Sequence, residues 1–291
     1  MARRRRHHRH WHEHLGLPTD PFAGEAPVPY WDGERARLLG EILLATASAA
    51  PVLTITGPAG IGKSVLRDAA IEHFEAEAFC LPLRGHVFLE PTTLTAQLWE
   101  GYADATGTTA KQTGSLRELG QAMAATLKQG ASLSILVDDA DELPQPCLDL
   151  LLNLGASLAR RPLRVVLFGR EGLETRLREH ARAGQVQHEP LEPLAPEDVA
   201  AYLAERLQLA AVEGRASPAF TDAELDRIVR HSDGVPGRID AEAQQQLRAR
   251  VRGGRGPGSG GRRRSRGRGG WRRLLRRLRA RLVLAGTAAV L

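Results

Sequence analysis

Short apolar runs alternate with amphipathic segments through about the first 190 residues of this 291-residue chain. One amphipathic segment carries Leu116, Leu119, Met123 and Leu127 at helical spacing. Strands that alternate with helices predict a three-layer α/β fold, a parallel sheet with helices on both faces. Five runs have the composition of strands, and the third and fourth are apolar enough to be buried on both faces: 52–56, 78–83, 133–137, 164–168 and 185–188.

After about residue 190 only helical periodicity remains. Pro196 is followed by two acids, which suits the start of a helix, and Val199 and Leu203 lie on one face of that helix. A second helix is expected to open at Thr221, because Glu224 three residues later completes a capping box. The pattern predicts a small helical subdomain packed on the α/β core.

Both ends of the chain are rich in arginine, whereas the part between them is acidic. Residues 1–14 hold five Arg and one Glu, and residues 248–291 hold fifteen Arg and no acid. The totals are 40 basic and 34 acidic residues, so 20 and 33 remain in 15–247, a net charge of −13. The predicted organisation is a disordered Arg/His arm (1–14), an α/β core (15–190), a helical lid (191–250), a Gly/Arg linker (251–270) and a basic amphipathic segment (271–291).

A glycine-rich motif directly follows the first predicted strand. The stretch GPAGIGKS, residues 57–64, matches the G-x-x-x-x-G-K-[ST] phosphate-binding loop at every fixed position. The alternative is a tight strand–helix turn, but the strand before the motif and the helix after it favour a nucleotide site. Lys63 would reach the β- and γ-phosphates of ATP. The predicted ATP-binding residues are Gly57, Pro58, Ala59, Gly60, Ile61, Gly62, Lys63, Ser64 and Val65.

Two acids end the third predicted strand, in the stretch LSILVDDAD. Asp138 would hold Mg²⁺ through water and Asp139 would orient the attacking water, as in other phosphate-binding-loop ATPases. The alternative is a pair of solvated acids at a strand end. Taken with the glycine-rich motif, the acids predict a site for ATP and Mg²⁺, with Ser64 and Asp138 as the metal ligands and Lys63, Asp138 and Asp139 as catalytic residues.

Five stretches resemble, in the same order, the AAA+ ATPases of the ExeA/GspA type, the general secretion pathway A proteins with an ORC/DEAH-like AAA+ domain. Similar modules occur at the front of DamX-like SPOR-domain division proteins. The resemblance covers residues 15–247, most of the chain. The stretches are LGLPTDPF, LVDDADEL, VVLFGREGLETRL, PLAPEDVAAYLAERL and AFTDAELDRIVRHSDGVPGRI.

The resemblance implies a P-loop NTPase of the AAA+ class, with a five-stranded core and a C-terminal helical lid. The lid would supply a sensor arginine, Arg238, whose alternative is a surface position at a helix N-terminus. Arg170 falls where the family has a glutamine that senses the γ-phosphate. Arg178 or Arg182 would act on a neighbouring subunit, which requires a homo-oligomer; each is alternatively a solvated helix charge. Asp139 replaces the family's glutamate and is shorter by about 1 Å, so slow hydrolysis is expected.

The C-terminal segment has the pattern of a helix that lies on an anionic membrane surface. In WRRLLRRLRARLVLAGTAAVL, one helical face is apolar, with Arg around the rest: Trp271, Leu274, Leu275, Leu278 and Leu282. The apolar residues 282–291 are too few to span a bilayer, which needs about 20. A truncated or shortened single-span protein is expected, with the arginines on the cytoplasmic side. The alternative is a disordered basic tail.

Three hypotheses for function follow. The first is a membrane-associated ATPase at the cytoplasmic face of the bacterial inner membrane, which drives assembly or conformational change in a secretion, cell-envelope or cell-division complex. The second is a DNA-associated ATPase of the transposition-helper type; the Gly/Arg linker suits phosphates, but the acidic body argues against it. The third is a nucleotide-binding scaffold without turnover, which the Asp–Asp pair permits.

Overall fold

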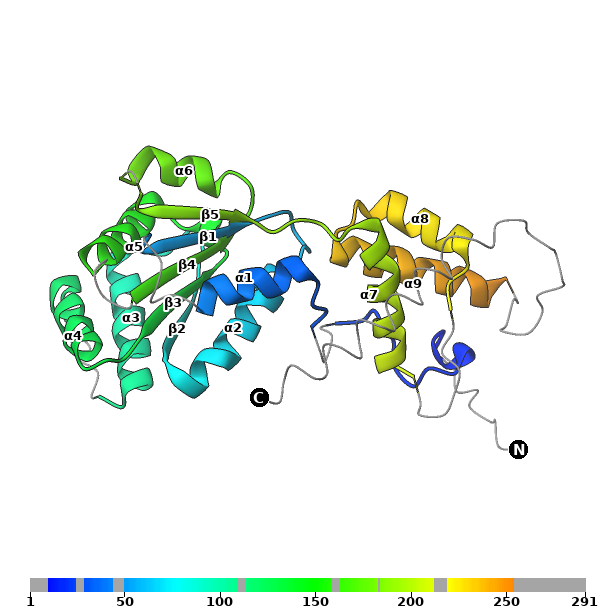
Figure 1. Ribbon diagram of the computed structural model, residues 1–291, viewed down its shortest axis with the longest axis horizontal. Helices are drawn as coiled ribbons and strands as arrows, with labels where there is room; N and C mark the ends of the chain where they lie inside the picture. Colours follow the sequence, from blue (N-terminus) through cyan, green and yellow to red (C-terminus); the bar gives the residue numbers. More distant parts are fainter. Residues whose placement is uncertain are drawn as a thin grey trace, which may run out of the picture.

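The computed structural model describes residues 10–24, 29–43, 50–108, 114–158, 163–182, 184–211 and 219–253. An α/β part built on a twisted sheet lies beside a separate group of helices (Figure 1). The sheet has five parallel strands in the order β2-β3-β4-β1-β5. The five predicted strands are all confirmed, each within two residues of its expected bounds: β1 Val52–Thr56, β2 Phe79–Arg84, β3 Leu133–Asp138, β4 Leu163–Gly169 and β5 Val186–Pro190.

Helices cover both faces of the sheet, as the three-layer prediction requires. Successive residues of a strand point to opposite faces: in β3, Ile135 packs in one core cluster and Leu136 in another. The first cluster includes residues of α3, α4, α5 and α6, and the second includes residues of α1 and α2. The bounds are α1 Gly33–Leu43, α2 Lys63–Glu77, α3 Pro91–Thr106, α4 Leu116–Lys128, α5 Gln145–Ser157 and α6 Leu173–His180.

Three helices form the lid, α7 Pro196–Leu209, α8 Asp222–Ser232 and α9 Pro236–Arg252. Pro196 stands in the first turn of α7. The predicted capping box of α8 is present, with the Thr221 hydroxyl accepting from the Glu224 amide. The lid has its own apolar core, separate from the two clusters of the sheet.

The N-terminal segment packs on the lid. The predicted organisation instead places residues from 15 onward in the α/β core. Leu15, Leu17 and Phe22 are buried in the lid core. Trp11 packs against the same core, and the Arg248 guanidinium lies over its ring, 5.6 Å from the centroid. The sequence predicts residues 10–14 as part of a disordered arm. The structure differs, because this apolar packing orders them and a short 3-10 helix, η1, spans Glu13–Leu15.

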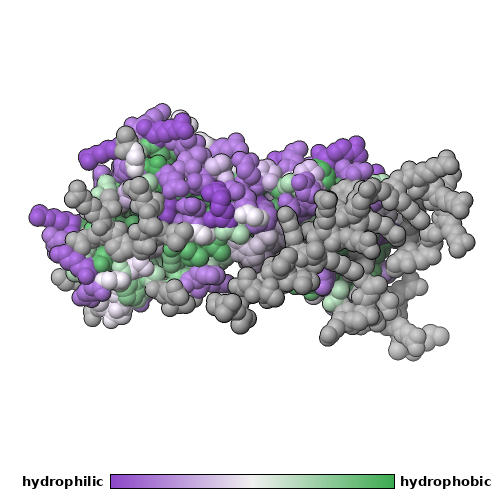
Figure 2. Space-filling view, viewed as in Figure 1, coloured by the Kyte–Doolittle hydropathy of each residue, from purple (hydrophilic) through white to green (hydrophobic). Residues whose placement is uncertain are grey.

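The surface of the α/β part carries both hydrophilic and hydrophobic residues. On the face shown in Figure 2, hydrophilic residues dominate the region over α6 and β5.

Within the described ranges, no helix combines the length and the apolar character that a bilayer crossing requires. The basic segment predicted over 271–291 lies outside those ranges, as do most of the arm and of the linker.

Gly85 marks the tightest backbone approach at the end of β2. Its amide donates to the Asp138 carbonyl at 2.7 Å, and a Cβ here would overlap the Asp139 carbonyl oxygen. Gly85→Ala should therefore lower the free energy of unfolding by about 1–3 kcal/mol, the usual cost of overpacking. Urea unfolding of the purified chain measures this change.

Gly120 in α4 is the matched control for that substitution. A Cβ at Gly120 meets only a Leu154 methyl at 4.0 Å. Gly120→Ala should raise the free energy of unfolding by about 0.5–1 kcal/mol, because alanine favours a helix interior. Equal unfolding midpoints for the two variants would contradict the described approach of β2 to β3.

Candidate nucleotide-binding site

The glycine-rich loop connects β1 to α2 at the carboxyl edge of the sheet. α2 begins at Lys63, so the N-terminus of this helix faces whatever the loop holds. Gly60 has φ 80° and Gly62 has φ 106°, left-handed values that glycine adopts without strain. The local sequence therefore builds an anion-binding turn of strand, loop and helix N-terminus.

Lys63 is folded back over the loop. Its ammonium donates to the Gly57 carbonyl at 2.7 Å and to the Pro58 carbonyl at 3.0 Å. Burial lowers the pKa of Lys63, although Asp141 and Asp138 raise it. A phosphate group would offer this partly desolvated ammonium a charged partner in place of two neutral carbonyl oxygens.

Ser64 and Asp138 lie in contact, although 74 residues separate them in the chain. The Ser64 hydroxyl donates to Asp138 Oδ2 at 3.1 Å, and the Asp139 amide donates to Asp138 Oδ1 at 3.0 Å. A hydroxyl and a carboxylate are oxygen donors of the type that Mg²⁺ prefers. The two residues thus fit Mg²⁺, which would neutralise phosphate charge when bound.

Asp139 directly follows β3 with φ 50°, a left-handed backbone that is uncommon outside glycine. Its Oδ2 accepts from Arg84 Nε at 3.1 Å. Arg84 has a side chain that is 80% exposed, so this ion pair holds Asp139 only weakly. The catalytic role of Asp139 remains a prediction.

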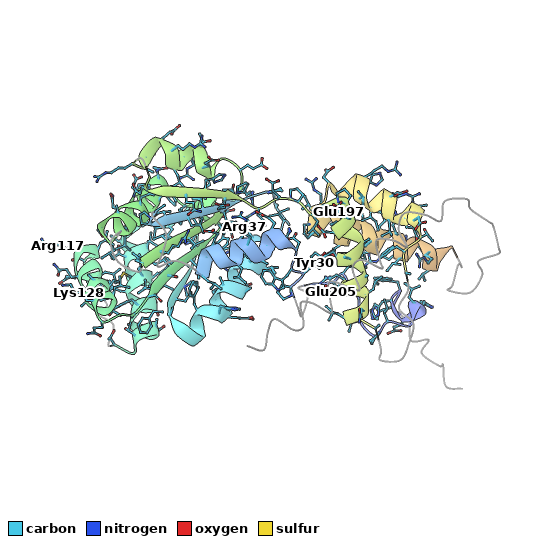
Figure 3. All side chains as sticks on the ribbon, in the orientation of Figure 1. Tyr30, Arg37, Arg117, Lys128, Glu197 and Glu205 are labelled. Atoms are coloured by element: carbon cyan, nitrogen blue, oxygen red, sulfur yellow. The ribbon has the colours of Figure 1, made fainter. Side chains whose placement is uncertain are left out.

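A cavity of about 400 Å³ joins these residues to the lid. The loop residues 59–65, both strand-end aspartates and Arg170 form its sheet side. Aromatic side chains close the other side, and Tyr30 lies between the α/β part and α7 (Figure 3). Apolar and aromatic walls beside a phosphate loop suit a purine base. The remaining walls include Trp31, Arg35, Leu194, Tyr202, Arg206, Pro236, Gly237 and Asp240.

The lid touches the phosphate loop through backbone atoms. The Gly237 amide, at the start of α9, donates to the Gly60 carbonyl at 2.9 Å. A Cβ on Gly237 would stand 3.2 Å from Gly60 Cα, so the absence of a side chain permits this approach. The lid position that faces the loop is therefore a glycine.

Arg238, the predicted sensor, lies one position further along α9. Its side chain is 55% exposed and pairs with Asp233 at 2.8 Å, away from the residues that line the cavity. Arg206 of α7 lines the cavity instead, buried and 3.4 Å from Asp240 Oδ2. Burial raises the pKa of Asp240 to about 6, against the opposing effect of Arg206. The sensor role of Arg238 stays a prediction.

The other predicted arginines lie at or beyond the rim of the cavity. Arg170 lines the cavity, and its amide donates to Asp141 Oδ1 at 3.0 Å. Arg178 pairs with Glu174 on α6 and Arg182 follows that helix; neither lines the cavity. The roles proposed for all three remain predictions.

Two arginines at the site, Arg67 and Arg35, were not predicted from the sequence. Arg67 forms an ion pair with Asp138, and its spacing three residues after Ser64 on one helix could have indicated this. Arg35 pairs with Asp32 and donates to the Ile61 carbonyl at 3.0 Å. Nothing in the sequence around Arg35 signals that α1 packs over the phosphate loop.

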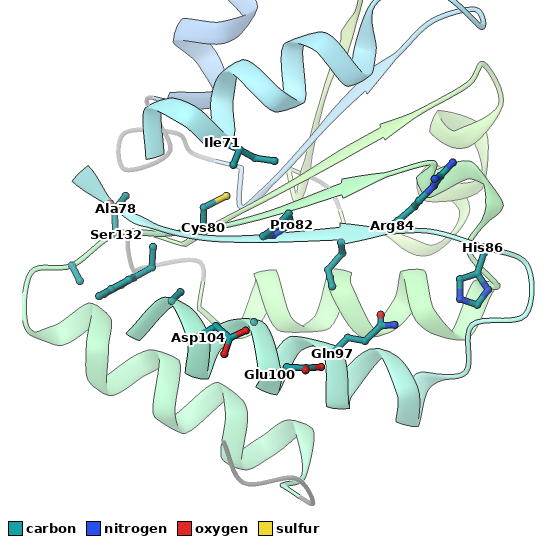
Figure 4. Close-up of a pocket in the computed structure, with 15 residues that line it drawn as sticks. Ile71, Ala78, Cys80, Pro82, Arg84, His86, Gln97, Glu100, Asp104 and Ser132 are labelled. Atoms are coloured by element: carbon teal, nitrogen blue, oxygen red, sulfur yellow. The ribbon is translucent and has the colours of Figure 1, made fainter. Parts of the chain in front are cut away.

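A larger hollow of about 1060 Å³ lies elsewhere, along the open edge of the sheet. β2 forms one wall, and α3 carries Gln97, Glu100 and Asp104 on the side that faces it (Figure 4). None of the predicted nucleotide residues lines this hollow. The smaller cavity, not the larger one, therefore holds the phosphate-binding chemistry.

Comparisons with known proteins agree with this geometry. Residues 46–177, just under half of the chain, match the family model described as AAA domain. Cdc6p from Pyrobaculum aerophilum has a similar structure, with a TM-score of 0.57 at 17% identity over 82% of this chain and 68% of that one. The ORC2 protein of Aeropyrum pernix, in ADPNP-ADP complexes, gives 0.55 at 16% identity over 81% and 67%.

The ORC1 protein of Aeropyrum pernix, in complex with DNA, gives a TM-score of 0.51 at 17% identity over 80% of this chain and 64% of that one. No curated protein matches the sequence. The fold is that of a P-loop NTPase of the AAA+ class, as predicted. Within that class, the chain carries an AAA domain structurally similar to the ORC/Cdc6 AAA+ ATPases.

Lys63→Ala should weaken binding of a fluorescent ATP analogue by about 10–100-fold, because it removes a charge-assisted hydrogen bond to phosphate. Lys128→Ala is the control, since Lys128 lies on α4, far from Tyr30 and the cavity (Figure 3). A fluorescence titration gives both dissociation constants. Equal affinities for the two variants would contradict the assignment of the site.

Proposed function

We propose that this chain is an AAA+ ATPase that binds ATP with Mg²⁺ and hydrolyses it slowly. The observation that carries the proposal is the cavity in which Lys63, Ser64, Asp138 and Asp139 meet under the lid. A phosphate cradle, two metal-binding oxygens and a second carboxylate are the parts that phosphoryl transfer to water requires. The chain's own residues would bind the phosphates, hold the metal and orient the water.

Slow turnover follows from the second carboxylate. An aspartate at 139 ends about 1 Å short of where a glutamate would place its oxygens, and a misplacement of that size can cost about 10²-fold in rate. Its contact with Arg84 also places a positive charge beside one carboxylate oxygen, which disfavours proton transfer to that oxygen. Such a site suits a switch, in which the bound nucleotide sets the state of the lid, better than a fast motor.

The contact between the lid and the loop supports this mode of action. Gly237 binds the Gly60 carbonyl directly, so a phosphate that reshapes the loop also moves the start of α9. AAA+ ATPases commonly act as oligomers, and Arg178 on α6 or Arg182 just after it would reach the site of a neighbouring copy. Turnover would then depend on assembly.

We further propose that the ATPase acts at the cytoplasmic face of the bacterial inner membrane, in a secretion, cell-envelope or cell-division complex of the ExeA/GspA type. The support is the Arg-rich amphipathic sequence over 271–291 together with the sequence resemblance. The second candidate is a DNA-associated role. It is favoured by the structural similarity to the ORC1 protein whose structure was determined with DNA, and opposed by the net charge of −13 over 15–247.

ATP turnover by the full chain should rise more than linearly with protein concentration, because a neighbouring subunit completes each site. Asp139→Glu should raise the rate by about tenfold or more, since the longer side chain brings the carboxylate to the water. Phosphate release measured across protein concentrations tests both statements. Turnover that is strictly proportional to concentration would refute the assembly requirement, and a slower Asp139→Glu variant would refute the role given to Asp139.

The full chain should float with anionic vesicles, and Leu275→Glu/Leu278→Glu should abolish flotation by placing charge on the apolar face. Phe88→Glu is the control, because it also replaces an exposed apolar residue by an acid, but on the α/β part and outside the basic segment. Anisotropy with duplex DNA at two salt concentrations forms the other arm of the experiment. Failure to float, combined with tight and salt-sensitive DNA binding, would replace the membrane proposal by the DNA-associated one.

A further inference from the structure

Arg67 connects two carboxylates, one inside the nucleotide site and one outside it. Arg67 Nη1 donates to Asp138 Oδ2, with the two side chains 21% and 9% exposed. Its Nε and Nη2 donate to Asp68 Oδ1 at 2.8 Å and 2.6 Å. Asp68 is the neighbouring residue on α2 and its side chain is 45% exposed. One guanidinium is therefore shared between a buried partner and an exposed one.

The contacts of Arg67 leave Asp138 fully engaged. Asp138 Oδ2 accepts both the Ser64 hydroxyl and Arg67 Nη1, and Oδ1 accepts the Asp139 amide. A buried carboxylate without a countercharge is costly, so Arg67 stabilises the charge of Asp138. Oδ2 is also the carboxylate oxygen that contacts Ser64. A water molecule on Mg²⁺ bound at Ser64 would need this oxygen as its hydrogen-bond acceptor.

We propose that Arg67 acts as an internal countercharge that competes with Mg²⁺ for Asp138. Arg67 holds Asp138 Oδ2 in the metal-free site and releases it when Mg²⁺ and nucleotide bind, by turning entirely onto Asp68. The proposal rests on the proposed function, because it concerns the metal side of that same site. Arg67 is a positioning residue: it acts on metal and phosphate through the carboxylate of Asp138.

The competition has two consequences of opposite sign. Without Mg²⁺, the charge of Arg67 offsets that of Asp138 and reduces its repulsion of the nucleotide phosphates. With Mg²⁺, the same Arg67 occupies an acceptor and repels the cation. Loss of Arg67 should therefore weaken nucleotide binding in EDTA and strengthen it in Mg²⁺. A purely structural role would weaken binding in both conditions.

The measurement is the dissociation constant of a fluorescent ADP analogue for the full chain, in EDTA and at saturating free Mg²⁺. In Arg67→Gln the ratio of the EDTA value to the Mg²⁺ value should rise at least tenfold over that of the unsubstituted chain. A tenfold change corresponds to about 1.4 kcal/mol, the scale of one charge-assisted hydrogen bond. Arg67→Lys keeps the charge and should leave the ratio within threefold.

Asp68→Asn weakens the partner onto which Arg67 is proposed to turn, and so tests the release of Arg67 from Asp138. Without its outer partner, Arg67 should stay on Asp138, so the ratio should fall by about threefold or more. If Asp68 acts through Arg67, the substitution should have no effect when added to Arg67→Gln. A simple loss of negative charge near the metal would lower the ratio equally in both backgrounds and would overturn the proposal.

The controls separate this proposal from the proposed function. Arg117→Gln removes an arginine from α4, far from the cavity, and should leave the ratio unchanged (Figure 3). If the unsubstituted chain binds no nucleotide under either condition, the proposed function fails. If it binds Mg²⁺-nucleotide but Arg67→Gln has an unchanged ratio, only the competition by Arg67 fails. Should Arg67→Gln not fold, an unchanged ratio in Asp68→Asn overturns the proposal by itself.

Discussion

The hydrogen bond between Ser64 and Asp138 is the contact on which the site depends. It joins the first turn of α2 to the end of β3, two elements that are not consecutive in the chain. The contact exists because β3 lies parallel to β4, and β4 to β1, so that the carboxyl ends of all three strands meet at one edge. The phosphate loop and the acid that faces it are thus brought together by the parallel sheet.

Charge within this contact is balanced by the chain itself. Asp138 is nearly buried and accepts from Ser64, Arg67 and the Asp139 amide, while Lys63 is held by two loop carbonyls. The Lys63 ammonium and the Asp138 carboxylate, on which the phosphates and the metal would act, therefore already have protein partners. Binding is therefore an exchange of partners, and Arg67 and Lys63 are the groups that have to move.

The lid forms the third part of the site, beside the phosphate loop and the end of β3. Its N-terminal helix α7 supplies Tyr202 and Arg206 to the cavity, and α9 meets the loop through Gly237. The lid has its own apolar core, which includes Leu15, Leu17 and Phe22, so the Gly237–Gly60 hydrogen bond ties the loop to one packed unit. A change at the loop would then be transmitted to the whole lid.

Local patterns predicted most of the fold, because each pattern is set by nearby residues. The apolar runs gave the strands, the Gly-rich turn gave the loop, and Thr221 with Glu224 gave the start of α8. The parts that could not be predicted depend on tertiary packing. Arg35 reaches Ile61 only because α1 lies over the loop, and Leu15 joins the lid only because the N-terminal segment folds back on it.

Arg238 and its neighbour Gly237 show how much depends on which face of a helix a residue occupies. The sequence placed an arginine near the lid–loop contact, but one step along a helix turns a side chain by about 100°. Gly237 consequently faces the loop, whereas Arg238 pairs with Asp233 at the surface. A helical start can be read from sequence more reliably than the face that each of its residues presents.

The central claim is that ATP and Mg²⁺ bind between the phosphate loop and the lid. Hydrogen–deuterium exchange of the full chain, with and without Mg²⁺-ATP, tests it most directly. The account predicts slower exchange over 57–66 and over 234–240, with no change over α4. Protection confined to other segments, or none at saturating ATP, would contradict it.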